Sequence, residues 1–381
     1  MTSPRRFDVL VIGAGIAGAS VAAELASRRR VVVLEMEEQP GYHTTGRSAA
    51  VFAECYGNRL VRALTRASRA FLTTTPPGDE VPLLVPRGWL SIARRDQMER
   101  LGDLEREILA NGGTVQPVSE AEARALVPIL RRGHVAAALL DQSAMDVDVH
   151  ALHQLYLRRL RAAGGETITG ARAVALDRAG RDWKVHTTQG DFAAPLVIDA
   201  AGAWADEVGR LAGATPIGLV PMRRTALILD LPRGTRISSW PLVVDADESF
   251  YFKPEGGRLL ASPADETPSP PCDARPEDLD VAVAIDRITA ACELEVSHVS
   301  RRWAGLRSFV ADRSPVAGFD PRAPGFFWLA GQGGYGIQTA PALSRLAAAL
   351  ALGEPVPADL AAEGVSAAQL APGRLAESAF D

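Results

Sequence analysis

The sequence opens with a glycine pattern that could bind phosphate groups. Gly13, Gly15 and Gly18 stand in GAGIAG, directly after an apolar run at residues 7–12. In a turn between a strand and a helix, this spacing points backbone N–H groups at a pyrophosphate. Gly13 permits the tight turn, Gly15 lets the backbone approach the phosphates, and Gly18 lets helix and strand pack closely. The pattern predicts a dinucleotide site, and an ordinary glycine-rich turn is the alternative.

Glu35 favours the dinucleotide. It ends VVVLE, the second expected strand, after a helix that runs to about residue 27. An acidic side chain at this point of a strand–turn–helix–strand unit can accept hydrogen bonds from a ribose hydroxyl. Ala17 and Met36 complete the predicted contacts of this unit with the dinucleotide.

The polar segment GYHTTGRSAA, residues 41–50, indicates which dinucleotide is bound. FAD is long, and its pyrophosphate, ribityl chain and flavin ring all need contacts. Hydroxyl side chains in this segment can donate to phosphate and ribityl oxygens, and its small residues let the backbone lie against the flavin. We expect His43 to be structural rather than catalytic. The predicted cofactor contacts here are Thr44, Thr45, Gly46, Arg47, Ser48 and Ala49.

A second glycine-rich loop, GQGGYGIQ, leads into the C-terminal helix and supports FAD. The N-terminus of that helix would face the flavin N1/C2 carbonyl end, where negative charge accumulates on reduction. Two more cofactor contacts, Val174 and Gly202, are predicted in the middle of the chain. The contacts predicted in the C-terminal loop are Gly333, Gly334, Tyr335, Gly336, Ile337 and Gln338.

Composition limits the class of protein. The chain has 381 residues, 47% of them hydrophobic, and a formal net charge of −5. This suffices for a sizeable core and about two domains. The arginines form no sustained basic stripe, so nucleic acid is not an expected partner. Cys55, Cys272 and Cys292 offer neither a metal motif nor a disulfide framework, which indicates no metal and a reducing cytoplasm.

The N-terminus could be taken for a signal peptide, because Arg5 and Arg6 precede an apolar run. Asp8 within that run and the fixed glycine spacing argue against this interpretation. No other stretch reaches about 18 uninterrupted apolar residues, so no membrane span is expected.

Apolar periodicity predicts alternating strands and helices. A strand, a glycine turn and a helix follow one another near residues 7–27, 196–206 and 326–350. The predicted fold class is α/β: a discontinuous Rossmann-like FAD-binding domain with a strand-rich α+β substrate-binding domain inserted in pieces. The first domain takes residues 1–80, 145–220 and 308–381, and the second takes 81–144 and 221–307. Further helices are expected at 98–111, 119–126, 148–163 and 277–291, strands at 171–177 and 183–187, and a linker at 73–82.

These motifs resemble the FAD-dependent D-amino acid oxidase superfamily. The resemblance is carried by the GxGxxG opening with Glu35, by GRSAA, by DAAGAWAD and by GQGGYGIQ. Within the superfamily, YHTTGRSAA, DESFYFKP and WAGLRSFVAD look most like bacterial D-arginine dehydrogenases over nearly the whole chain. The resemblance implies non-covalent FAD, since no cysteine lies in the segments where related sarcosine oxidases attach flavin.

The resemblance also implies a substrate site. Arg224 and Arg307 occupy positions that bind the substrate carboxylate in the family, and a guanidinium matches a carboxylate bidentately. Tyr56 and Tyr251 match tyrosines that line the pocket, and Gly334 would present its carbonyl to the substrate amine. Core or surface roles for these side chains are the alternatives. Arg223 is expected to face solvent.

The substrate pocket departs from that of the arginine enzymes. Trp89 stands where they have an acidic residue, Val51 replaces a histidine, and Gln338 would bracket the flavin. A cationic side chain would lose its hydration without gaining a partner. We therefore expect neutral or apolar D-amino acids as substrates, unless Glu54 swings inward to replace the acid.

The expected reaction is hydride transfer from Cα to flavin N5, then hydrolysis of the imino acid to a 2-oxo acid and ammonia. The partners are thus an amino acid and an unidentified electron acceptor, and the resemblance favours a dehydrogenase. Secondary or cyclic amines, such as N-methyl or proline-like amino acids, would suit the same arginines. A flavoprotein that binds FAD without turnover is the remaining alternative.

Overall fold

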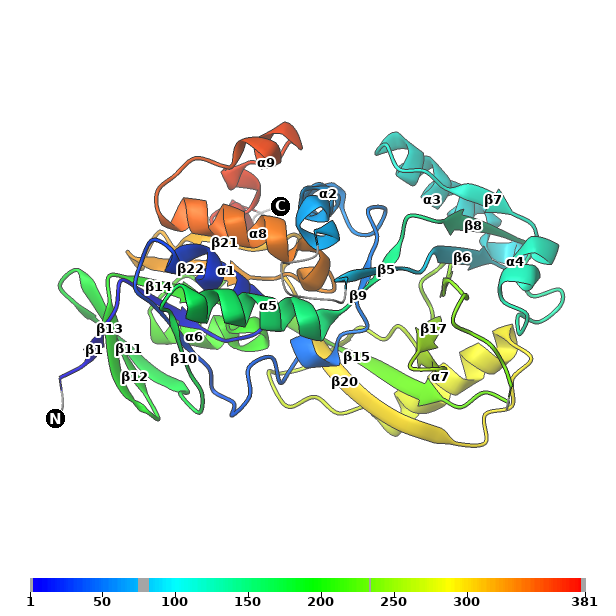
Figure 1. Ribbon diagram of the computed structural model, residues 1–381, viewed down its shortest axis with the longest axis horizontal. Coiled ribbons are helices and arrows are strands. Elements are labelled where there is room, and N and C mark those ends of the chain that lie inside the picture. Colours follow the sequence, from blue (N-terminus) through cyan, green and yellow to red (C-terminus); the bar gives the residue numbers. More distant parts are fainter. Residues whose placement is uncertain (1–2, 75–81, 233, 378–381) are drawn as a thin grey trace.

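A computed structural model describes residues 3–74, 82–232 and 234–377 (Figure 1). Most of the linker predicted at 73–82 lies outside the described residues. The helices predicted between residues 98 and 291 are confirmed within one or two positions. They are α3 (Met98–Ala110), α4 (Glu120–Leu126), α5 (Val149–Ala162) and α7 (Asp278–Ala291).

Two apolar four-residue strands form the centre of a mainly parallel sheet. Every residue of β2 (Val9–Ile12) and β3 (Val31–Leu34) is buried, as expected for a strand covered on both faces. The sheet has six strands in the order β10-β3-β2-β14-β22-β21, and only the edge strand β21 is antiparallel. The other strands are β10 (Glu166–Ile168), β14 (Leu196–Asp199), β21 (Val316–Phe319) and β22 (Phe326–Ala330).

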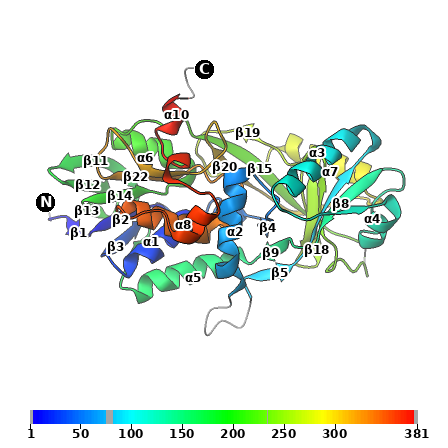
Figure 2. The same cartoon turned by 90° about the horizontal axis from the view of Figure 1, so that it is seen from above.

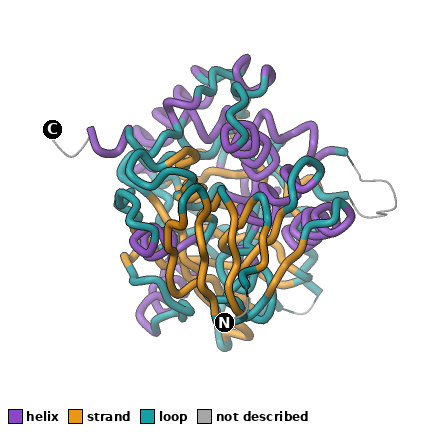
Figure 3. Tube along the Cα trace, turned by 90° about the vertical axis from the view of Figure 1, so that its left-hand side faces the viewer, coloured by secondary structure: helices purple, strands orange, loops and turns teal. Residues whose placement is uncertain are grey.

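Alternate side chains of this sheet bury two different layers. Val9, Val11, Val31 and Val33 pack with helices α1 (Ile16–Ala26) and α8 (Gly336–Ala351). Their neighbours in sequence face a four-stranded sheet, β1-β13-β12-β11, which lies in the foreground of Figure 3. The period of two along each strand therefore gives a three-layered half. The four strands are β1 (Arg5–Arg6), β11 (Ala173–Ala179), β12 (Asp182–Thr187) and β13 (Gly190–Ala194).

A nine-stranded sheet fills the other half of the molecule, on the right of Figures 1 and 2. Its two longest strands, β15 (Val220–Leu229) and β20 (Val299–Phe309), are antiparallel neighbours and reach back toward the first half. Helices α3 and α7 contact this sheet. The remaining strands are β6 (Trp89–Ala93), β7 (Gln116–Val118), β8 (Ala137–Asp141), β16 (Leu242–Asp245), β17 (Tyr251–Glu255), β18 (Arg258–Ser262) and β19 (Thr267–Pro268).

The α/β architecture predicted from the sequence is confirmed, and the exact domain boundaries stay a prediction. A small sheet of β4 (Val51–Phe52), β9 (Met145–Val147) and β5 (Leu84–Pro86) lies at the junction of the halves. Helix α2 (Arg59–Thr73), which the sequence reading did not predict, packs against α8. The shorter helices include α6 (Ala205–Leu211), α9 (Ala358–Ala362) and α10 (Arg374–Glu377).

Candidate active site

A cavity of about 610 Å³ runs between the two halves, and the first turns of α1 and α8 both line it. Most residues predicted to contact the cofactor lie in its wall. Four of them do not line it: Gly18, Gly46, Tyr335 and Gln338. Those that do are Gly13, Gly15, Ala17, Glu35, Met36, Thr44, Thr45, Arg47, Ser48, Ala49, Val174, Gly202, Gly333, Gly334, Gly336 and Ile337.

The glycine turn after β2 has room only for hydrogen at two positions. Gly13 has φ +98°, and a Cβ atom there would lie 2.5 Å from the carbonyl oxygen of Ala200. A Cβ atom on Gly18 would overlap the carbonyl oxygen of Gly13. The turn thus brings the N-terminus of α1 to the cavity wall, where the helix dipole suits a pyrophosphate.

Glu35 stands at the end of β3 and orders the same turn. Its carboxylate accepts the N–H groups of Ala14, at 2.7 Å, and Glu37, at 3.0 Å. Burial raises the pKa of this carboxyl, and the two N–H donors act in the opposite direction. Each carboxylate oxygen keeps a second acceptor position for a ribose hydroxyl.

The loop at residues 41–49 is held by its own polar side chains. Thr45 Oγ1 accepts the N–H of Ile16 at 3.0 Å, and Thr44 Oγ1 donates to the carbonyl of Leu306 at 2.7 Å. The Arg47 guanidinium donates to the carbonyls of Ala274, at 2.9 Å, and Ala304, at 3.0 Å. Its charged end therefore joins the loop to the other half, although Arg47 also lines the cavity.

Two buried nitrogen atoms near the cavity lack partners among the described residues. His43 lines the cavity and binds Glu37 through Nε2 at 2.8 Å, whereas its Nδ1 has no partner. Gln338, in α8, accepts the Ala53 N–H and leaves Nε2 unpaired. Buried polar groups are rarely left unpaired, so the free Nδ1 of His43 fits a wall that also contacts a polar cofactor, whereas Gln338 lies outside that wall. The glycine cradle, Glu35 and His43 together fit FAD.

The two arginines predicted to bind carboxylate lie on neighbouring strands. Arg224 of β15 is opposite Gly305 of β20 in the antiparallel register, and Arg307 follows Gly305 by two positions. Side chains two residues apart in a strand share a face, so both guanidinium groups project from one face of the sheet. Gly305 adds no side chain to this face, and all three residues line the cavity.

Arg307 is a cation without an acidic partner. Among the described residues no carboxylate forms an ion pair with it, whereas Arg224 binds Glu266 at 3.0 Å. The Tyr56 phenol lies near the Arg307 guanidinium and interacts with it. Burial lowers the pKa of this guanidinium, but the phenols of Tyr56 and Tyr251 offset that effect, so its pKa is raised. Arg307 therefore carries a positive charge that a bound anion can neutralise.

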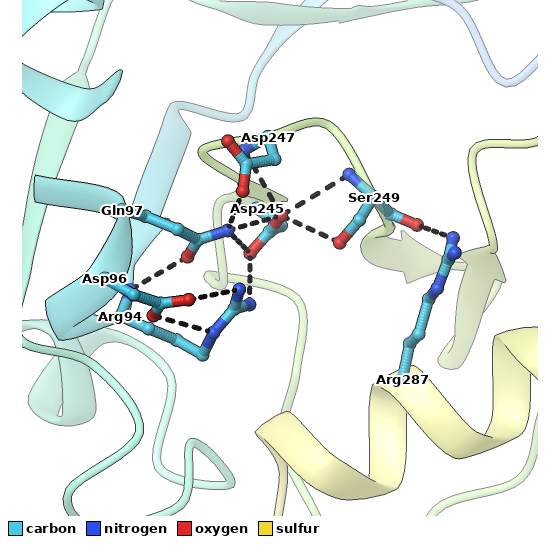
Figure 4. A network of polar contacts seen from close by, with 7 residues as sticks. All are labelled: Arg94, Asp96, Gln97, Asp245, Asp247, Ser249 and Arg287. Carbon is cyan, nitrogen blue, oxygen red and sulfur yellow. Dashed lines mark hydrogen bonds and ion pairs between the residues drawn. The ribbon is translucent and has the colours of Figure 1, made fainter. Parts of the chain in front are cut away.

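Tyr251 reaches the cavity from the first position of β17, directly after a tight hairpin turn. Figure 4 shows the carboxylate of Asp245 at the centre of this turn. It accepts hydrogen bonds from Gln97 Nε2, at 3.0 Å, and Ser249 Oγ, at 2.7 Å. Arg94 lies 3.3 Å from the same carboxylate. The network fixes the start of β17 and hence the position of Tyr251.

A second cavity, of about 300 Å³, is lined by a group of three aromatic rings, none of which lines the first cavity. Tyr56 lies 5.2 Å from Trp89 and 4.9 Å from Tyr335, measured between ring centroids, and all three line this cavity. Asp141 also lines it, and its oxygens accept from Ser143 and Cys55.

Three further residues considered in the sequence, Val51, Glu54 and Arg223, do not point into the cofactor cavity. Val51 pairs with Asp146 in a short strand and lines neither of the two cavities. Glu54 binds Arg69 at 2.6 Å, so the structure gives it no inward orientation. The expectation that Arg223 faces solvent was wrong: its side chain is only 11% exposed and binds Asp280 at 3.0 Å.

Several residues that line the cofactor cavity were not predicted from the sequence. Trp204 follows the predicted Gly202, and Ala171 and Arg172 precede the predicted Val174. All lie in connections that follow strands of the parallel sheet, where ligands of such sheets usually bind. That rule could have identified them.

Fold and cavity together define a flavin-binding oxidoreductase. The chain belongs to the DAO family of FAD dependent oxidoreductases, whose profile matches residues 8–350. FAD is accordingly its cofactor. None of the described cysteines lines the cofactor cavity, and the non-covalent attachment of FAD stays a prediction.

Relatives of known activity are distant but match over much of the chain. Glycine oxidase from Geobacillus kaustophilus is 26% identical over 91% of this chain and 93% of its own. Human mitochondrial sarcosine dehydrogenase is 27% identical over 80% of this chain and 30% of its own. These relatives do not single out the D-arginine dehydrogenases, so that closer resemblance stays a prediction.

Solved structures confirm the fold. The crystal structure of the Geobacillus glycine oxidase superposes with a TM-score of 0.82 at 24% identity, covering 94% of this chain and 98% of that one. L-proline dehydrogenase from P. horikoshii gives 0.81 at 21% identity and covers 99% of both chains. Among the described residues, no helix combines the length and apolar character needed to cross a membrane.

Proposed function

We propose that this chain is a D-amino acid dehydrogenase that oxidatively deaminates a substrate with a neutral or apolar side chain. The products are a 2-oxo acid and ammonia. The observation that carries the proposal is Arg307, a cation in the cavity wall that no carboxylate among the described residues neutralises. Its position beside Arg224 and Tyr251 suits the carboxylate of an amino acid.

The protein's part in the reaction is orientation. Arg307 and Arg224 would hold the carboxylate from one face of the sheet, with the Tyr251 hydroxyl beside it. The Gly334 carbonyl would accept a hydrogen bond from the amine. Bound FAD supplies the chemistry by accepting a hydride from the substrate carbon. Holding that carbon at a fixed position accounts for much of the expected rate enhancement.

Deprotonation of the substrate amine requires no strong base near Arg307. The Tyr56 phenol lies near Arg307, and its hydroxyl group can both donate and accept hydrogen bonds. A water molecule, or the Tyr56 oxygen, can take the amine proton. We therefore expect the rate to rise with pH to a plateau as the bound amine becomes neutral.

The preference for neutral side chains rests on Trp89 and Glu54. The Trp89 indole donates to Ser91 Oγ at 3.1 Å and packs beside Tyr56. Glu54 is occupied by Arg69, and the Asp141 oxygens are occupied by Ser143 and Cys55. A cationic side chain would therefore have to displace existing partners.

Steady-state kinetics test this proposal. Values of kcat/KM for D-leucine, D-methionine and D-phenylalanine should exceed that for D-arginine by about tenfold or more. A preference for D-arginine would overturn the side-chain assignment. If the protein is a dehydrogenase, a dye acceptor should sustain turnover, whereas oxygen as the sole acceptor should give slow turnover and little hydrogen peroxide.

A second candidate is the oxidation of a secondary or cyclic amine. Sarcosine dehydrogenase and L-proline dehydrogenase are among the similar proteins, and their named substrates also carry a carboxylate beside the amine. Sarcosine, D-proline and L-proline therefore belong in the same substrate panel. Faster turnover of these than of any D-amino acid would favour this candidate.

A further inference from the structure

Glu266 binds two arginines from different parts of the molecule. Its Oε1 lies 3.0 Å from Nη2 of Arg224 and 2.9 Å from Nη2 of Arg313. Its Oε2 lies 3.0 Å from the same nitrogen of Arg313. The carboxylate therefore joins strand β15 to the segment that follows β20.

The contact with Glu266 fixes the orientation of the Arg224 guanidinium. A second contact, from Nε to the carbonyl of Asp265 at 2.7 Å, lies on the adjacent residue of the same loop. Asp265 in turn accepts the N–H and the hydroxyl of Thr225, at 2.6 and 3.0 Å. Because a guanidinium is planar, two contacts on one edge determine where its remaining N–H groups point.

Nη1 of Arg224 is the guanidinium nitrogen that takes part in neither of these contacts. Among the described residues it has no hydrogen-bond partner, and Arg224 lines the cavity with Arg307 and Tyr251. The edge held by Asp265 and Glu266 thus leaves donors for a ligand in the cavity.

Arg313 holds the other side of Glu266. Its guanidinium carbon lies 3.8 Å from the centroid of the Phe309 ring. That ring occupies the space a side chain at Gly333 would need, in the loop before α8. Glu266 is therefore anchored, through Arg313 and Phe309, to the loop before α8, in which Gly333 lines the cavity.

We propose that Glu266 is a positioning residue that aims Arg224 at the substrate carboxylate. The inference rests on the proposed function, in which Arg224 and Arg307 bind that carboxylate together. Arg307 supplies the uncompensated charge, and Arg224, already paired with Glu266, supplies directed hydrogen bonds. Glu266 itself does not touch the substrate.

Substitution of Glu266 tests the proposal. Benzoate, a carboxylate without an amine, serves as the probe. In the FAD-loaded protein, E266Q should weaken benzoate binding about tenfold, as measured by the change in the flavin spectrum. KM for the best D-amino acid should rise by a similar factor, with a smaller change in kcat. E266D should recover part of the loss, and R313Q should weaken benzoate binding in the same direction, since Glu266 loses its anchor.

Glu363 offers a matched control. Its side chain is 33% exposed, as is that of Glu266, and it binds Arg66 at 2.8 Å, away from the cavity residues. E363Q should bind benzoate as the wild type does. Equal benzoate affinity and KM in E266Q and the wild type would overturn the proposal. Failure of the proposed function differs, because the wild type itself would then neither bind benzoate nor oxidise amino acids.

Discussion

The guanidinium of Arg307 lies directly against the backbone of Gly334. A Cβ atom on Gly334 would be 2.9 Å from both Cζ and Nη1 of Arg307. Real Cβ atoms do not approach other atoms so closely, so a side chain at residue 334 must displace the guanidinium. This contact places a predicted carboxylate ligand beside a predicted amine ligand, on segments that are distant in the sequence.

Gly334→Ala should therefore impair substrate binding while FAD is retained. The added methyl group pushes Arg307 from its position, and we expect KM to rise about 100-fold. Gly373→Ala is the matched control, because a Cβ atom there has nothing within 4 Å. Steady-state kinetics and the flavin spectrum provide the two readouts. An unchanged KM in G334A would show that the site does not need Arg307 where it lies.

Removing the charge of Arg307 should impair turnover more than displacing its side chain does. Arg307→Gln removes a cation that has no acidic partner among the residues the structure describes, and kcat/KM should fall about 100-fold or more. Arg301→Gln, on the exposed part of the same strand, should have little effect. Turnover by R307Q within a few-fold of the wild type would contradict the carboxylate assignment.

The hairpin before Tyr251 should depend on Asp245. Asp245→Ala leaves Gln97 and Ser249 without their shared acceptor (Figure 4), and we expect a loss of about 2–4 kcal/mol in the free energy of unfolding. Asp96→Asn changes the exposed partner of Arg94 in the same network and should leave the free energy of unfolding nearly unchanged. Urea denaturation measures both, and similar stabilities of the two variants would refute the role of Asp245.

Asp199 should make stability depend on pH. Burial raises the pKa of this carboxyl well above its ordinary value, the nearby Asp206 adds to the effect, and the Ala201 N–H opposes it. The folded chain thus keeps a proton that the unfolded chain releases. The stabilisation is complete below the unfolded pKa, about 4, and is lost as pH rises through the folded pKa.

Asp199→Asn removes this titration. Relative to the variant, the wild type should lose about 1.4 kcal/mol for each pH unit within that window. Urea denaturation of both proteins at several pH values between about 4 and 8 measures the difference. A difference in stability that does not change with pH would contradict the assignment.

The parts of the fold and site that were predictable are those set by local pattern. The buried strands around Gly13 follow from their apolar runs, and the tight approach at Gly18 follows from the glycine spacing. Periods of two and 3.6 residues identify such elements without knowledge of the rest of the chain.

Pairings across the fold were not predictable in the same way. The Arg47 guanidinium binds carbonyls at residues 274 and 304, and Arg224 binds Glu266. Arg223, one residue earlier, points to the opposite face and binds an acidic residue of α7. The pairing of each arginine with its acidic partner depends on loop conformations and on the register of β15 with β20. No local sequence pattern encodes these features.

The most direct test of the account is anaerobic mixing of the FAD-loaded protein with single amino acids. D-leucine should bleach the absorbance of the oxidised flavin in the wild type, and L-leucine should bleach it far more slowly. R307Q, carrying the same amount of FAD, should be reduced about 100-fold more slowly at low substrate concentration. Equal reduction of wild type and R307Q, or no reduction by any D-amino acid, would contradict the central claim.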